Sequence, residues 1–369
     1  MSAALGLPLA SPMELAVEQP PNRASDAGCI CARLLCCFRR RGFPAARQAL
    51  AAPRGCFSSW RCRCYMVLAA VAVLIGVALA IRNALANKGF SQDRAIMFAK
   101  LAGAAYCSPE SLEAWSCGEK CIPQVSKPVK VCAGETTQAF VTTWEHHGLV
   151  SFEGTKTYMS MVQDLRTYKS ATNWPLCGDS CSVHDGFLTE WQSLKSCVED
   201  SLTAIGSPKG SEIRVTGHSL GGAVSSLAMV ELHYDGWHIK EAMSFGMPRA
   251  GDTGFSQVFT RLFSGRYFRV THHMDPIPHV PPEEFDFLHF GREVFYDGDV
   301  SLGHKECDDA EDELCAGQYW NVVSDLAYVS DHLDYMGQAT GSTGCVGLSR
   351  ALNRSSTHEP STAPLPLVT

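Results

Sequence analysis

A serine flanked by glycines is the residue in this 369-residue chain that points most directly to chemistry. Ser219 lies in G-H-S-L-G-G at 217–222, between the β-branched run 213–216, which predicts a buried strand, and the run 223–230, which predicts a helix. On so sharp a strand-to-helix turn the hydroxyl is exposed, and the glycines avoid collisions across the turn. The pattern predicts a nucleophilic serine. The structural alternative is a glycine-rich turn with a bystander serine.

A nucleophilic serine needs a base and a carboxylate that orients it. Asp275 follows a strand-like run, at the start of a proline-rich loop, where its carboxylate could hold an imidazole. His332 lies beside a predicted helix near the C-terminal end, but spacing alone does not select it among 13 histidines. His289 and His304 are alternative candidates for the base. The structural alternative is that His332 is an ordinary surface histidine. The order Ser219, Asp275, His332 is the order of an α/β hydrolase.

Six short motifs, in order, resemble the fungal-type triacylglycerol lipases of class 3. They are V-S-F-E-G-T at 150–155, H-D-G-F at 184–187, G-H-S-L-G-G at 217–222, S-F-G-M-P-R at 244–249, D-P-I-P-H-V-P-P at 275–282 and H-L-D-Y at 332–335. The resemblance implies an α/β-hydrolase fold, with a mostly parallel sheet and helices on both faces. It also implies Ser219, Asp275 and His332 as the catalytic triad, and it places His289 on a non-catalytic histidine of the family.

Two backbone N–H groups are expected to bind the oxyanion of a tetrahedral intermediate. One is that of Leu220, the residue after the nucleophile, at the positive end of the predicted helix. The resemblance implies Thr155 as the second, whereas helix N-capping is the structural alternative for this threonine. The sequence departs from the family at Glu153, where an arginine is usual, so we expect a rewired local salt bridge.

The segment after Thr155 predicts a short amphipathic helix. Its apolar positions 158, 161, 162 and 165 fall on one helical face. The resemblance implies a lid that covers the serine in water and opens at a lipid surface, and a core-packed helix is the alternative. The candidate lid residues are Tyr158, Met159, Met161, Val162 and Leu165.

These features predict a serine hydrolase that cleaves carboxylic esters of lipids without a metal or an organic cofactor. Tri- or diacylglycerol is the expected substrate, and a phospholipid, a monoacylglycerol or a small soluble ester is the alternative. A different class of function is a catalytically silent, lipase-like protein that binds lipid or a partner. The chain contains neither a P-loop nor a dinucleotide-binding fingerprint.

The segment 65–81 predicts a membrane anchor. It has 17 residues without a charge, and as a helix it would span about 26 Å, the lower limit for a bilayer. Nine arginines against three acidic residues precede it, so we expect this end to be cytoplasmic and the catalytic domain to be luminal or extracellular, in type II orientation. The alternative is a signal peptide cleaved near A-L-A at 84–86 and a secreted protein.

The domain organisation follows from these assignments. We predict a basic, cysteine-rich and disordered cytoplasmic arm at 1–64, the transmembrane anchor at 65–81 and a linker at 82–92. The α/β-hydrolase domain follows at 93–347 and a disordered tail at 348–369. The tail contains a glycosylation sequon at Asn353. Anionic lipid headgroups explain the basic arm better than nucleic acid does. We expect a lipid or membrane substrate and no obligate protein partner.

Cysteine usage agrees with a catalytic domain in an oxidising compartment. Ten of the 17 cysteines follow the apolar segment, an even number. Spacing suggests three short bridges, which are Cys117–Cys121, Cys177–Cys181 and Cys307–Cys315. The family implies that Cys107–Cys345 joins the two ends of the domain. The remaining pair, Cys132–Cys197, follows by elimination. The bridge from Cys307 encloses an acidic cluster, for which a solvated face is favoured over a calcium site.

Overall fold

The computed structural model describes residues 89–156, 168–177, 181–319 and 328–345, together with Val71 and Gly76. No helix in these ranges is long and apolar enough to cross a bilayer. Apart from Val71 and Gly76, the predicted anchor lies outside the described residues. So do the five candidate lid residues and Asn353.

An eight-stranded mixed sheet forms the centre of the domain, with the strand order β1-β2-β3-β6-β7-β8-β9-β10. β3, β6, β7, β8 and β9 run parallel, while β1, β2 and β10 are antiparallel to their neighbours. The strands span Val125–Ala133 (β1), Gln138–Trp144 (β2), His147–Phe152 (β3), Glu212–His218 (β6), His238–Phe245 (β7), Tyr267–His272 (β8), Arg292–Tyr296 (β9) and Lys305–Cys307 (β10). The mostly parallel sheet predicted from the sequence is confirmed.

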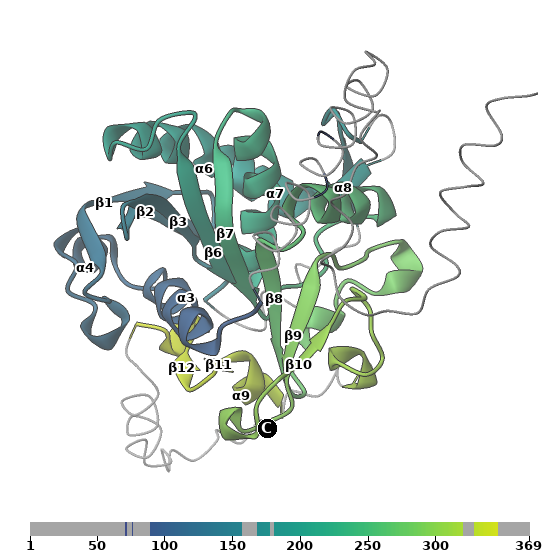
Figure 1. The fold of residues 1–369 in the computed structure, drawn as a ribbon. Helices are drawn as coiled ribbons and strands as arrows, with labels where there is room; N and C mark the ends of the chain where they lie inside the picture. The colour runs from purple at the N-terminus through teal and green to yellow at the C-terminus, as the bar shows by residue number, and fades with distance from the viewer. Residues whose placement is uncertain are drawn as a thin grey trace, which may run out of the picture. The chain divides into compact units, whose positions relative to one another are not determined.

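Helices cover both faces of this sheet, as predicted (Figure 1). α3 and α4 pack on one face, and α6, α7 and α8 pack on the other. Their bounds are Gln92–Ala104 (α3), Pro109–Ala114 (α4), Asp185–Ala204 (α6), Leu220–Tyr234 (α7) and Thr253–Phe263 (α8). Side chains of a strand alternate between the two cores: Leu149 of β3 packs with α3, and Val150 packs with α6 and α7.

The position of α8 follows from its N-cap and from the spacing of its apolar residues. Asp252 is the N-cap, and its carboxylate accepts the Phe255 N–H at 2.8 Å. The residues buried against the sheet recur at helical spacing and are Phe255, Val258, Phe259 and Phe263.

Small elements complete the domain. β4 (Lys169–Thr172) pairs with β5 (Cys181–His184), and α9 (Val329–His332) leads into the two-stranded β11 (Asp334–Tyr335) and β12 (Gln338–Ala339). Five disulfides occur among the described residues, and they join the pairs that the sequence suggested. The Cys107–Cys345 bridge ties the start of the domain to its end.

Candidate active site

Ser219 sits on a strained turn between β6 and α7. Its φ of 59° and ψ of −134° are unusual for a residue with a side chain, and its N–H donates to the Phe245 carbonyl at 2.8 Å. A Cβ on Gly217 would lie 2.2 Å from the Gly221 oxygen, and one on Gly221 would lie 2.4 Å from the Phe152 oxygen. Both flanking glycines are therefore required by backbone contacts, as the motif predicts.

Asp275 and His332 meet at the carboxyl ends of the parallel strands. The His332 Nδ1 lies 2.8 Å from Asp275 Oδ2 and 3.0 Å from Oδ1, and both side chains are buried. Because a carboxylate only accepts, Nδ1 carries the proton, and Nε2 has the lone pair that a base needs. Asp275 Oδ1 also accepts the Ile277 N–H at 2.9 Å, which fixes the carboxylate within its own loop.

Two residues at this carboxylate were not assigned a role from the sequence. The Tyr335 hydroxyl donates a hydrogen bond to Asp275 Oδ2, and burial together with Asp275 raises the pKa of Tyr335 well above its usual value. Gly246 has a φ of +55°, and a Cβ there would lie 2.6 Å from Tyr335 Oη and 2.7 Å from Asp275 Oδ2. The H-L-D-Y and S-F-G motifs contain these residues, but only the fold shows that they meet.

His218 connects the serine turn to His332. Its Nε2 donates to the His332 carbonyl at 2.8 Å, so its Nδ1 accepts from the Tyr106 hydroxyl, also at 2.8 Å. Burial lowers the pKa of His218 well below its usual value, which keeps the ring neutral. The ring centroids of His218 and His332 are 4.5 Å apart. Ser219, the next residue, is therefore brought to the His332 side of the sheet edge.

The segment 153–155 lies against the serine turn, as an oxyanion site requires. A Cβ on Gly154 would lie 2.5 Å from the His218 oxygen and 3.0 Å from the Ser219 Cβ. Thr155 follows directly, and Leu220 is the first residue of α7. Thr155 is thus next to a residue that contacts the serine turn, and Leu220 is next to Ser219 itself.

Glu153 has an unusual environment for a carboxyl group. Its side chain is 1% exposed, and it lies 3.3 Å from the exposed Nζ of Lys156. Burial raises the pKa of Glu153 to about 7, and Lys156 opposes this rise. At this departure from the family pattern the charged partner of Glu153 is thus Lys156, and Thr155 lies between the two in the chain.

The two alternative histidines lie elsewhere. His289 Nε2 donates to the Pro278 carbonyl at 2.7 Å, and His304 packs on the ring of Phe90 with centroids 4.7 Å apart. Among the described residues neither is hydrogen-bonded to Asp275, whereas His332 is. No cluster of three or more His, Cys, Asp or Glu side chains suited to a metal occurs in the ranges that the structure covers.

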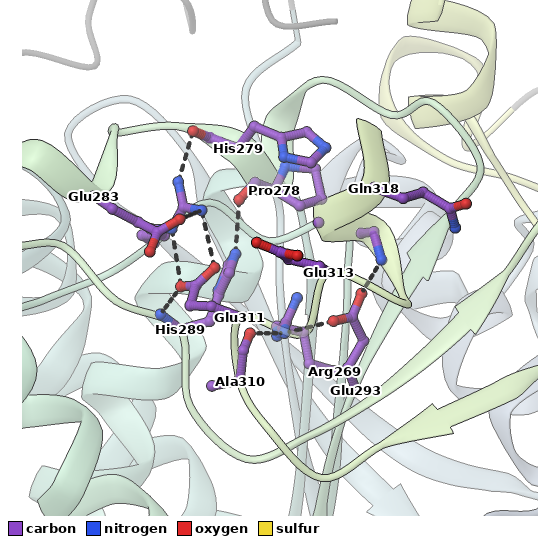
Figure 2. A pocket seen from close by; sticks show the side chains of 13 residues that line it. Arg269, Pro278, His279, Glu283, His289, Glu293, Ala310, Glu311, Glu313 and Gln318 are labelled. Carbon is purple, nitrogen blue, oxygen red and sulfur yellow. Dashed lines mark hydrogen bonds and ion pairs between the residues drawn. The ribbon is translucent and has the colours of Figure 1, made fainter. Parts of the chain in front are cut away.

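A polar cavity of about 570 Å³ lies beside the loop that carries Asp275 (Figure 2). Its wall includes Pro278 and His279 of that loop and residues of the acidic segment after Cys307. Burial lowers the pKa of His279 to about 4, with Arg249 as a further cause, so this ring is neutral.

Comparison with known proteins agrees with the site. The family described as "Lipase (class 3)" matches residues 149–285. The chain is 34% identical over 144 residues to a secreted mono- and diacylglycerol lipase of Fusarium solani, covering 37% of this chain and 43% of that protein. It is 30% identical over 200 residues to a lipase of Rhizomucor miehei, covering 52% of each. The matches thus span about half or less of these relatives.

Solved structures share the fold over a larger part of their length. A lipase of Rhizopus microsporus var. chinensis superposes with a TM-score of 0.57 at 26% identity, covering 69% of this chain and 88% of that one. A triacylglycerol lipase whose catalytic centre is described as a serine protease triad has a TM-score of 0.56 at 25% identity, covering 70% and 98%.

Proposed function

We propose that the chain is a class 3 lipase of the α/β-hydrolase superfamily and that it hydrolyses carboxylic esters of lipids by a serine mechanism. The observation that carries the proposal is the buried Asp275–His332 hydrogen bond, with the His332 ring 4.5 Å from that of His218, the residue before a serine held at positive φ. Relatives named as mono-, di- and triacylglycerol lipases support an acylglycerol substrate.

The proposed reaction uses the three side chains in sequence. The Ser219 Oγ attacks the acyl carbonyl while His332 Nε2 takes its proton, and the same proton then passes to the departing alcohol. Water repeats the cycle on the acyl-serine and releases the fatty acid. Asp275 holds the Nδ1–H and stabilises the imidazolium that forms, and Tyr335 and Ile277 hold Asp275.

The oxyanion of each tetrahedral intermediate is proposed to bind the N–H groups of Leu220 and Thr155. Leu220 is at the N-terminus of α7, where the helix dipole favours negative charge. The contact of Gly154 with the serine turn supports the assignment of Thr155. Removing one such donor typically costs about 100-fold or more in rate.

We also propose the membrane attachment and the lid that the sequence predicts. The uncharged segment 65–81 and the arginines before it support a type II anchor, and the similarity to a secreted lipase of Fusarium supports an extracellular catalytic domain. The apolar face of the segment after Thr155 supports the lid. Asn353 is the proposed glycosylation site.

Fatty acid release from emulsified triacylglycerol, diacylglycerol and phosphatidylcholine tests the function. The full-length chain, produced in an oxidising compartment, is compared with Ser219→Ala. We expect release by the wild type and a loss of about 10⁴-fold or more in the variant, because the nucleophile is absent. A folded, disulfide-intact wild type that neither releases fatty acid nor reacts with a serine-directed phosphonate would instead indicate a silent lipid-binding protein.

A further inference from the structure

The acidic loop closed by the Cys307–Cys315 disulfide is not simply a solvated face. Asp308 is exposed, as expected for such a loop, whereas Glu311, labelled in Figure 2, lines the polar cavity. Glu311 forms an ion pair with Arg249. The side chains of Arg249 and Glu311 are only 6% and 21% exposed. This partly buried pair lies at the wall of the polar cavity.

The pair has the two-pronged geometry that fixes direction as well as distance. Arg249 Nε donates to Glu311 Oε1 at 3.0 Å, and its Nη2 donates to Glu311 Oε2 at 2.9 Å. Such bidentate pairs are stronger and more directional than single contacts. The exposed Glu283 also accepts from Nη2, at 3.1 Å.

The other side of the same guanidinium holds the loop that carries Asp275. Arg249 Nη1 donates to the His279 carbonyl at 2.7 Å and to the Pro281 carbonyl at 3.0 Å. The Arg249 N–H donates to the Val280 carbonyl at 2.9 Å. These carbonyls follow the end of β8, so no strand neighbour satisfies them, and Arg249 supplies the donors that burial requires.

Glu311 reaches the same loop by a second route. Its Oε1 also accepts the His289 N–H at 2.7 Å, and the His289 ring donates to the Pro278 carbonyl at 2.7 Å. The acidic loop itself is bound to the sheet by buried Arg269 of β8. This arginine donates to the Ala310 carbonyl and forms an ion pair with Glu293 at 3.0 Å.

We propose that Glu311 is a positioning residue for the triad, which acts through Arg249 and His289 on the loop 275–282 and so sets the place of the Asp275 carboxylate. The inference rests on the proposed function in one respect, that Asp275 orients His332 during ester hydrolysis. The disulfide closes the loop that presents Glu311, so the acidic loop becomes part of the support of the active site.

Glu311→Gln tests this with Glu313→Gln as a matched control, since Glu313 is an exposed carboxylate of the same loop. Glutamine keeps the size and removes the charge. We expect kcat of Glu311→Gln to fall about tenfold or more with KM within about twofold, because sub-ångström misplacement of catalytic groups is costly. Glu313→Gln should match the wild type.

The pH profile separates positioning from a general loss of stability. Asp275 and His218 face the His332 ring, and Tyr335 and Tyr106 contact these two. The charged or titratable groups around that set are His272, His279, Asp331, Glu293 and Glu153. Asp275 is the carboxylate that is hydrogen-bonded to the ring, so its displacement makes the imidazolium harder to form. The acid limb of kcat/KM should therefore move to lower pH in Glu311→Gln and stay in place in Glu313→Gln.

Hydrogen exchange of the backbone amides in 275–282 gives a readout that is independent of activity. We expect faster exchange there in Glu311→Gln than in the control. Equal kcat, pH limb and exchange in the two variants would overturn the positioning role. If the wild type hydrolyses no ester, the proposed function fails, and the exchange rates alone then decide whether Glu311 holds the loop.

Discussion

Single residues around the candidate active site are kept in defined protonation states by burial. His218 is neutral because burial lowers its pKa, and Tyr335 stays protonated because burial and Asp275 raise its pKa. A neutral His218 can hold the His332 carbonyl without competing for the Asp275 charge. The site thus concentrates its negative charge on the one carboxylate that faces His332.

Glu153 is a buried residue whose charge state should change near neutral pH. Its pKa is about 7 in the folded chain, above the ordinary value of 4.5, so the folded state binds the proton more tightly than the unfolded state does. The stability that follows is present below about pH 4.5 and is lost as the pH rises through about 7, a change of about 3 kcal/mol. The free energy of unfolding of Glu153→Gln should therefore not fall in this way as the pH rises.

Urea unfolding at about pH 5 and about pH 8 measures the effect. The exposed Glu284→Gln serves as control, and it should follow the wild type at both values. A Glu153→Gln variant that declines with pH as steeply as the wild type would refute the assigned titration.

At the scale of elements, the ends of four neighbouring strands position the site. β3 ends before the segment of Thr155, β6 before Ser219, β7 before Gly246 and β8 shortly before Asp275. Because parallel strands end at the same edge of a sheet, segments far apart in the chain meet there. Gly246 is the place where the end of β7 touches the Asp275–His332–Tyr335 cluster.

Gly246→Ala should therefore displace the cluster. The added Cβ would lie 2.6–2.9 Å from Tyr335 Oη, Asp275 Oδ2 and His332 Nδ1, so we expect a loss of about 100-fold in kcat/KM. Gly206→Ala is the matched control, since Gly206 also has positive φ, +86°, but an added Cβ meets nothing within 4 Å. Equal kcat/KM in the two variants would show that the cluster tolerates the methyl group.

At the scale of the whole molecule, disulfides close the domain on itself. Cys107–Cys345 links residues 238 apart in the chain, whereas Cys117–Cys121 links residues only 4 apart. The longer link restricts the unfolded chain far more, because loop entropy grows with loop length.

Replacing both cysteines of one bridge by serine should show how much more the long link stabilises the fold than the short link does. We expect Cys107→Ser/Cys345→Ser to lower the free energy of unfolding by about 5 kcal/mol, and Cys117→Ser/Cys121→Ser to lower it by about 2 kcal/mol. Denaturant unfolding under oxidising conditions measures both. The reverse order of the two losses would contradict the entropic explanation.

The sequence by itself determined the strand–serine–helix turn, the order of the three candidate catalytic residues and the α/β class. These depend on neighbours in the chain: β-branched runs, the glycines beside Ser219 and the proline-rich loop after Asp275 encode local backbone shape. The choice of His332 over His289 and His304 needed the family motif, since spacing alone left all three open.

Only the tertiary structure decided which distant residues meet. Asp275 and His332 are 57 residues apart, and Arg249 and Glu311 are 62 apart, yet each pair shares hydrogen bonds. No periodicity predicts such contacts, because they depend on the order in which strands enter the sheet and on where each loop returns. The inward turn of Glu311 is the clearest case: within a run of acidic residues it looks like its exposed neighbours, and only the buried Arg249 distinguishes it.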